Sequence, residues 1–177
     1  THRFALPGRD GDVCHGFIAG LAPGQAYGLR AEGPWDPAAG HLFDPAKLLV
    51  DPHATALDRP FHWHPDLARR GVDTHHLVPR ALVQDTLALP RPRMARAPHV
   101  IYEINVRGFT MRHPDVPEAQ RGTVAALAHP AVMAHLKKLG VDTLELMPLA
   151  AFIDERHLPS LGLGNAWGYN PVQFLAP

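Results

Sequence analysis

Carboxylate side chains are the residues of this chain best suited to acid–base chemistry. Asp154 and Glu155 are neighbours in a stretch expected to be a loop, and Glu103 and Glu145 each occur within a strand-like run. Acid–base hydrolysis needs one ionised carboxylate and a second carboxyl group whose pKa is raised in a partly desolvated pocket. Adjacent carboxylates usually point apart, and a carboxylate within a buried strand is usually a hydrogen-bonded structural group. We therefore favour structural roles over catalytic ones for all four, with the loop pair either solvated or paired with Arg156.

The 13 histidines raise the question of a metal site. Those at 62 and 64 and at 75 and 76 match neither the i, i+4 pair on a helix nor the spacing of zinc-binding motifs. The glycines at 162, 164 and 168 do not follow a strand-to-helix turn, so they do not form a dinucleotide-binding fingerprint. We therefore predict neither a metal site nor a dinucleotide-binding site from these residues.

Composition and charge exclude several classes of protein. The chain has 177 residues, with 17 Lys and Arg against 17 Asp and Glu, so its formal net charge is zero. A basic nucleic-acid-binding arm or a polybasic membrane anchor needs an excess of positive charge. No apolar run approaches the roughly 18 residues of a membrane span, and the single cysteine, Cys14, excludes an internal disulfide. The chain opens at Thr1 without a leader, and we expect it to be a piece of a longer protein.

Turn residues divide the first half of the chain into short segments. The 19 prolines and 15 glycines of the chain are spread along its whole length, which is typical of short strands and long loops. A strand over 13–19 and another over 26–31 are predicted to form a hairpin around the turn at 21–25. Asp44, followed by Pro45, is predicted to cap a short helix.

A second pattern begins after Pro98, which we take as the end of a long connecting segment. The run 100–106 is β-branched and aromatic and predicts a strand. Apolar residues at helical spacing predict a helix over 130–139, ended by a glycine, and a second strand follows over 141–147. A strand, a helix and a strand joined by short loops predict a βαβ unit with parallel strands. A third strand-like run covers 172–175.

These residues resemble glycoside hydrolase family 13, the α-amylase superfamily, and within it the bacterial glycogen debranching enzymes and isoamylases. Upstream motifs at 12–15 and 40–49 are similar to the carbohydrate-binding-type module of that group. In the second half the similarity is carried, in order, by 102–110 (YEINVRGFT), 113–117 (HPDVP), 135–141 (HLKKLGV), 145–148 (ELMP), 152–157 (FIDERH) and 167–170 (WGYN).

The resemblance implies a fold in two incomplete domains. Residues 1–58 would be the C-terminal part of an all-β sandwich, 59–98 a connecting segment, and 99–177 the first strands of a (β/α)₈ TIM barrel. A complete barrel takes about 250 residues, so this α/β barrel would be a fragment. The catalytic carboxylates of the family follow later barrel strands. We therefore expect them downstream of Pro177 and assign no catalytic residue in this chain.

The resemblance also points to substrate-binding residues. Tyr169 corresponds to the tyrosine on which the sugar beside the scissile bond stacks, and Trp167 would help to shape the pocket. An aromatic ring offers area to the apolar C–H face of a sugar at a small entropy cost. The alternative is that both rings pack the loop against the barrel rim. Ala166 and Pro171 depart from the family pattern, which affects the pocket wall.

The function implied is that of an α-1,6-glucosidase that removes branches from glycogen or limit dextrin in the cytoplasm, without an organic cofactor. The chain by itself is expected to be inactive, with an α-glucan as its partner and neither nucleic acid nor membrane. One alternative is a non-catalytic glycan-binding fragment that uses Tyr27 and Trp35. Another is a different enzyme of the same architecture, such as a branching enzyme or a trehalose-releasing hydrolase.

Overall fold

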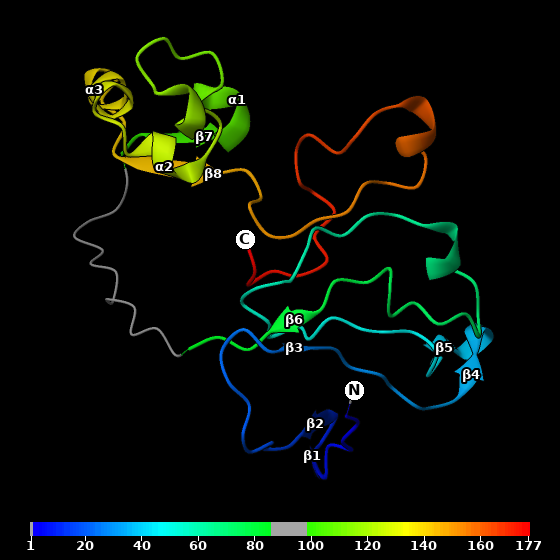
Figure 1. Ribbon diagram of the computed structural model, residues 1–177. Helices are drawn as coiled ribbons and strands as arrows, with labels where there is room; N and C mark the ends of the chain where they lie inside the picture. Colours follow the sequence, from blue (N-terminus) through cyan, green and yellow to red (C-terminus); the bar gives the residue numbers. More distant parts are fainter. Residues whose placement is uncertain (1, 86–98) are drawn as a thin grey trace.

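The structure is a computed structural model that describes residues 2–85 and 99–177; the predicted boundary at Pro98 lies outside the described residues. Its strands are short and pair two by two: β1 with β2, β3 with β6, β4 with β5, and β7 with β8. The first six strands lie in one part of the molecule, and β7 and β8 lie in another together with the α-helices (Figure 1). The sandwich and the closed barrel that the resemblance implies stay predictions.

The hairpin predicted for the first part is wrong. Strand β2 (Val13–His15) turns back at Gly11 and pairs antiparallel with β1 (Gly8–Asp10), whereas β3 (Ala26–Tyr27) pairs with β6 (Ala81–Leu82). The turn at 21–25 does form, with the Gln25 amide donating to the Ala22 carbonyl at 3.1 Å. The turn chemistry was therefore read correctly, but it does not specify which strand is the partner. The loop that joins β1 to β2 is shorter than the one that would join the strands predicted at 13–19 and 26–31. Closing it therefore costs less chain entropy.

The segment after β3 forms a second hairpin. Strands β4 (Trp35–Asp36) and β5 (His41–Leu42) pair antiparallel across the 3-10 helix η1 (Pro37–Ala39). The helix predicted after Asp44 is only a turn, in which the Asp44 carboxylate accepts from the Ala46 amide at 3.0 Å. It cannot extend because Leu49 exchanges two backbone hydrogen bonds with Leu29 and is therefore extended.

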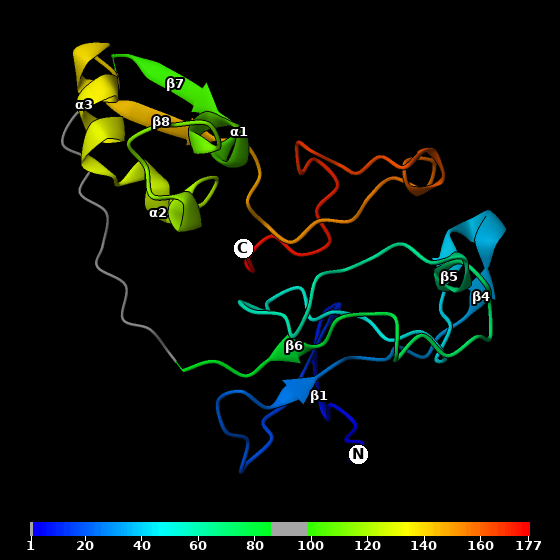
Figure 2. The same ribbon diagram turned by 45° about the horizontal axis from the view of Figure 1, so that its top comes forward.

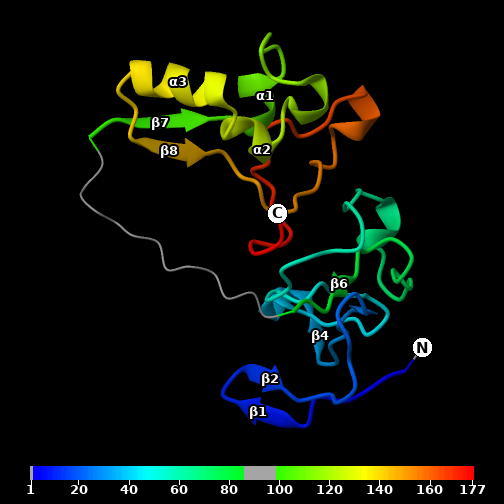
Figure 3. The ribbon, with the colours of Figure 1, turned by 60° about the vertical axis from the view of Figure 1, so that its left-hand side comes forward.

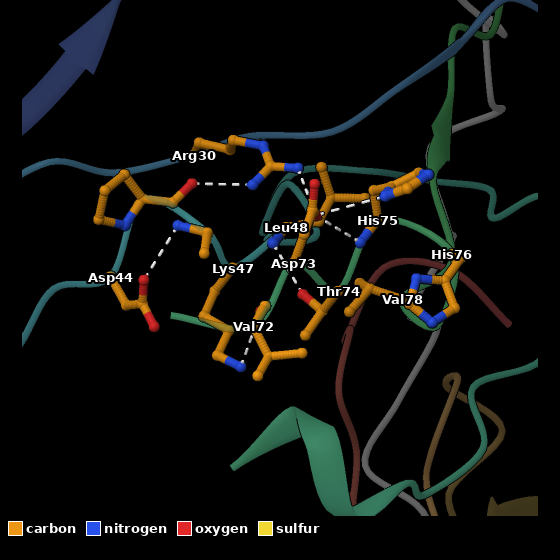
Figure 4. Close-up of polar contacts among 12 residues, drawn as sticks. Arg30, Asp44, Lys47, Leu48, Val72, Asp73, Thr74, His75, His76 and Val78 are labelled. Carbon is orange, nitrogen blue, oxygen red and sulfur yellow. Dashed lines mark hydrogen bonds and ion pairs between the residues drawn. The ribbon is translucent and has the colours of Figure 1, made fainter. Parts of the chain in front are cut away.

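Residues 59–85, predicted as part of a connection, are hydrogen-bonded to residues between 24 and 48. This segment contains η2 (Pro65–Leu67) and β6, and Thr74, Val78 and Ala81 are buried. The Arg30 guanidinium donates to Asp73 at 2.7 Å, and the Leu48 amide donates to the Thr74 hydroxyl at 3.0 Å. Figure 4 shows these contacts together with the bond from the Lys47 ammonium group to the Val72 carbonyl. The same group also donates to the backbone carbonyls of residues 66 and 69.

The second part confirms the predicted βαβ unit. Strand β7 (Ile101–Ile104) is parallel to β8 (Thr143–Leu146), and between them lie α1 (Val106–Thr110), η3 (Glu118–Gln120), α2 (Val124–Leu127) and α3 (Pro130–Lys138). Helix α3 runs along one face of the two strands (Figure 3). It begins at a proline in the first turn and is followed by Gly140 at φ +76°, as its sequence predicts.

The core of this part lies between the strands and the helices. Val132 and Leu136 of α3 pack with Val116 and Ala126, and Ile104 of β7 packs with Val106 and Leu127. Phe109 and Leu144 contact both clusters, so the two form one continuous apolar layer. Among the described residues, no helix has the length and apolar character that crossing a membrane requires.

The last segment, 147–177, connects the two parts. It contains η4 (Pro159–Leu161) and runs between the β7–β8 unit and the first part (Figures 1 and 2). The strand predicted over 172–175 does not form; an isolated bridge joins Phe152 to Pro171 instead. Gln173 is fully buried, and its side chain donates to backbone carbonyls of the first part. This side-chain contact, and not pairing with a strand, holds the segment against the first part.

Candidate functional site

The two aromatic residues predicted to bind substrate lie in one groove. Trp167 and Tyr169 are 67% and 58% exposed, and together with Glu103 and Met147 they line an open groove of about 650 Å³. Met147 directly follows β8, and Glu103 belongs to β7, so the groove lies near the carboxyl ends of two parallel strands. Barrel enzymes use this end of their strands for their sites.

The loop of residues 162–169, called the aromatic loop below, carries both rings and is held by its own asparagine, Asn165. The Asn165 side-chain oxygen accepts hydrogen bonds from the Trp167 amide at 3.1 Å and from the Gly168 amide at 2.8 Å. Asparagine forms such turns with its own backbone two residues further on. The Asn165 amide in turn donates to the Asp154 carboxylate at 2.7 Å, and its side chain donates to Glu155 at 3.4 Å. Asp154 and Glu155 thus support the loop through Asn165, whereas the sequence predicted a pair that is solvated or bound to Arg156.

Two further contacts fix this loop against the βαβ unit. The Asn105 side-chain amide donates to the Ala166 carbonyl at 3.1 Å, while its oxygen accepts from Gly108 at 2.8 Å and caps α1. Gly168 is buried at φ +79°, and a Cβ there would lie 2.8 Å from the Pro148 carbonyl oxygen. Only glycine fits such a position without strain.

Tyr169 is joined to Glu103 across the groove. Its hydroxyl donates to the Glu103 carboxylate at 3.3 Å. The pKa of Tyr169 is raised above its ordinary value, first by lost solvation, then by the charge of Glu103 and the hydrogen bond to it, and by the charge of Glu145.

Glu103 and Glu145 are direct neighbours in the register of β7 and β8. Both side chains are exposed, whereas a catalytic acid needs a partly desolvated pocket. We therefore assign neither of them a catalytic role. Sequence reasoning weighed Glu103 only as a strand carboxylate and missed its position in the groove. The signal that could have found it is its place near the carboxyl end of a predicted parallel strand.

Tyr169 also lines a second groove, of about 600 Å³. This groove shares Met147 and Tyr169 with the first groove, and its lining, which includes Pro171 and Phe174, is mostly apolar. Pro171 was noted in the sequence only as a departure from the family pattern. Phe174 lies in a run predicted to be a strand and was not singled out. Tyr169 therefore lines two hollows of the surface.

The other aromatic pair considered from the sequence does not form a common platform. Tyr27 lies in β3 and Trp35 in β4, which belong to different sheets. The Tyr27 hydroxyl donates to Asp51 at 2.8 Å, and burial together with that carboxylate raises its pKa to about 12. The Arg70 guanidinium lies 4.4 Å from the centre of the Trp35 ring. Both aromatic residues are thus engaged within the first part.

Some of the histidines contact neighbouring residues in the chain. His64 accepts a hydrogen bond from the Asp66 amide at 3.2 Å and caps η2, and the His75 ring lies 3.4 Å from Asp73. Within residues 2–85 and 99–177, no three side chains of His, Cys, Asp or Glu are grouped as metal ligands would be. Cys14 is exposed in β2.

Three relatives found by comparison with known proteins carry the same name, glycogen debranching enzyme. The chain is 46% identical over 187 residues to a glycogen debranching enzyme of Klebsiella pneumoniae, covering 98% of this chain and 28% of that protein. It is 46% identical over 185 residues to a glycogen debranching enzyme of Cronobacter sakazakii, with the same coverage of both. A third, from Yersinia enterocolitica, is 47% identical over 178 residues, which cover 95% of this chain and 27% of the relative. No family model matches the chain.

The chain therefore spans between a quarter and a third of the length of these relatives. The similarity extends over nearly all of this chain, so both the first part and the βαβ unit with its aromatic loop have counterparts in them. The chain is related in sequence to a part of the proteins named glycogen debranching enzyme.

Proposed function

We propose that the chain is the glucan-contacting part of a family 13 glycoside hydrolase that cleaves α-1,6 branch linkages in glycogen or limit dextrin. The names of its relatives support a role in debranching. The observation that carries the proposal is the exposed pair Trp167 and Tyr169 in one groove near the carboxyl ends of β7 and β8. In this proposal both rings contact the glucan.

The physical argument rests on the shape of a sugar. A glucose ring presents C–H groups on its faces and hydroxyls around its edge, so an aromatic ring can cover the face while polar groups meet the edge. Tyr169 offers a ring with more than half of its surface exposed, beside a carboxylate that can accept hydrogen bonds. The loop is already held by Asn165 and Asn105, so little ordering entropy is lost on binding.

The chemistry itself is assigned to residues outside this chain. Retaining glycosidases use two carboxyl groups about 5–5.5 Å apart, one as the nucleophile and one as the acid and base. The proposal assigns this pair to segments downstream of Pro177 in a longer cytoplasmic enzyme, on a completed (β/α)₈ barrel that needs no organic cofactor. The chain alone would then bind α-glucan without hydrolysing it.

A binding experiment tests the proposal. Migration of the purified chain in a native gel that contains glycogen should be retarded, and Tyr169→Ala should remove most of the retardation. Trp167→Ala should weaken it. Phe4→Ala, which truncates an exposed aromatic residue outside the groove, is the matched control and should migrate like the wild-type chain. Equal retardation of Tyr169→Ala and wild type would contradict the proposal.

The same gel separates the proposal from the alternative glycan-binding interpretation. If the first part bound the glucan, Trp35→Ala would abolish the retardation and Tyr169→Ala would leave it intact. The engagement of Tyr27 by Asp51 and the position of Arg70 over Trp35 argue against that outcome.

A further inference from the structure

The groove beside Trp167 has a single carboxylate in its lining. Its four lining residues are Glu103, Met147, Trp167 and Tyr169, of which only Glu103 carries a charge. The Glu103 carboxylate accepts the hydrogen bond of the Tyr169 hydroxyl at 3.3 Å, across 66 positions of sequence. The chemistry proposed above uses the face of the Tyr169 ring and leaves the role of this carboxylate open.

We propose that Glu103 is a positioning residue that holds the Tyr169 ring in the orientation in which its face meets a glucose unit. This inference rests on the proposed function, because it concerns the ring that the glucan would contact. It adds a role for a residue of β7 that sequence reasoning treated as part of the strand alone.

The contacts of the aromatic loop explain why such a residue is needed. Asn165 and Asn105 fix the backbone of the loop at residues 166–168, and Gly168 allows its turn. None of these contacts reaches the Tyr169 ring, which is more than half exposed. An exposed aromatic side chain can populate more than one rotamer. Fixing it in one rotamer on binding costs conformational entropy, which weakens the affinity. A hydrogen bond at the far end of the ring limits this freedom.

Glu103 is well suited to this task because it is built on a strand. Its register opposite Glu145 ties its backbone to β8, and the next residue, Ile104, is buried in the core. Side chains supported by regular elements hold a site more precisely than those on loops. A charged acceptor also makes a stronger bond than a neutral one. After the larger effect of lost solvation, the charge of Glu103 and the bond to that carboxylate contribute to the raised pKa of the Tyr169 hydroxyl.

A double-mutant cycle tests the inference, with α-1,4-linked maltoheptaose as the probe and calorimetry as the measurement. Tyr169→Phe keeps the ring and removes the donor, and Glu103→Ala keeps the donor and removes the acceptor. Each is expected to weaken binding about fivefold, and the double variant is expected to be no weaker than either single one, because both remove the same bond. Glu103→Gln, which keeps a neutral acceptor, should restore part of the affinity.

Glu145→Gln is the matched control. It removes the same charge from the neighbouring position of β8 without removing a hydrogen bond to Tyr169, and it does not line the groove. Its affinity should equal that of the wild-type chain. The Tyr169 ring carbon signal in NMR provides a second readout: its titration should move toward the ordinary pKa of tyrosine in Glu103→Ala.

The outcomes are separable. If the wild-type chain binds and Tyr169→Phe and Glu103→Ala bind as tightly, the positioning role is wrong while the glucan site stands. If the two losses multiply in the double variant, Glu103 acts independently of Tyr169 and the inference is also wrong. If the wild-type chain does not bind the probe at all, the proposed function fails first.

Discussion

The side chain of Gln173 reaches back across 121 positions to donate a hydrogen bond to the Pro52 carbonyl at 2.8 Å. It donates a second one to the Asp51 carbonyl at 3.0 Å, and its own oxygen accepts from the Leu175 amide. At 2% exposure, Gln173 is a fully buried polar side chain with every polar atom bonded. It joins the segment behind the aromatic loop to the first part of the chain.

Removing this amide should destabilise the molecule. Gln173→Leu keeps the size of the side chain but removes the two hydrogen bonds that Gln173 donates to the Asp51 and Pro52 carbonyls. We expect a loss of about 1–3 kcal/mol in the free energy of unfolding, since each of these two bonds contributes about 0.5–1.5 kcal/mol. Urea titration followed by tryptophan fluorescence measures it. Gln84→Leu, at an exposed position, should change the midpoint little; equal midpoints for the two variants would show that the Gln173 contact contributes nothing.

Gly168 should be the least replaceable glycine of the aromatic loop. Gly168→Ala introduces both a left-handed backbone strain and a contact 2.8 Å from the Pro148 carbonyl oxygen. Gly162→Ala has the strain alone, at φ +69° with open space around its Cβ. Strain of this kind costs about 1–2 kcal/mol. Overpacking should add about 1–3 kcal/mol for Gly168→Ala. Thermal melts of the two variants compare these costs directly, and a smaller effect at Gly168 would contradict the close approach.

The ion pair between Arg30 and Asp73 should make stability depend on acid pH. The Arg30 hydrogen bond, then the bond from the His75 amide, lowers the pKa of Asp73 to about 2. A carboxyl group with a depressed pKa stabilises the fold at pH values above its unfolded pKa, near 3.9, and this contribution is lost as the pH falls toward 2. Asp73→Asn should therefore reduce the pH dependence of the melting temperature between about pH 5 and pH 2. Asp115→Asn, at an exposed site, is the comparison, and identical profiles for wild type and Asp73→Asn would refute the linkage.

An exposed apolar ring of the last segment, together with the free strand edges of the second part, should cause self-association. Phe174 is 80% exposed beside the second groove, and β7 and β8 have no further strand at either edge within the described residues. Free strand edges and apolar patches are common sites of association. Sedimentation velocity should show oligomers at high protein concentration, reduced in Phe174→Asp. Phe17→Asp changes an even more exposed ring, at 91%, in the first part and should leave association unchanged. A monomer at every concentration would contradict this expectation.

The sequence predicted local structure better than long-range pairing. Helix α3 and its two flanking strands followed from apolar spacing, a proline in the first turn and Gly140 at its end, all signals within a few residues of one another. The pairing of Ala26 with Leu82 did not follow, because a strand pattern does not name its partner. The helix predicted after Asp44 failed for a similar reason: a distant residue, Leu29, pairs with Leu49 and holds it extended.

The sequence predicted only part of the candidate site. Trp167 and Tyr169 were selected because of a family resemblance, since an aromatic pair in a loop has no distinctive spacing of its own. Glu103 joins them only because β7 and β8 are parallel and the chain returns past their carboxyl ends. That closeness is a tertiary property, and sequence patterns of period two or 3.6 do not contain it.

Asn105 has a consequence for the order in which the molecule assembles. One end of its amide caps α1 three residues away, and the other end holds the Ala166 carbonyl 61 positions later. Local contacts form sooner than distant ones because they close smaller loops. On a ribosome, the cap would be complete while the aromatic loop was still being synthesised. The groove would thus mature after the cap, on a helix end that is already in place.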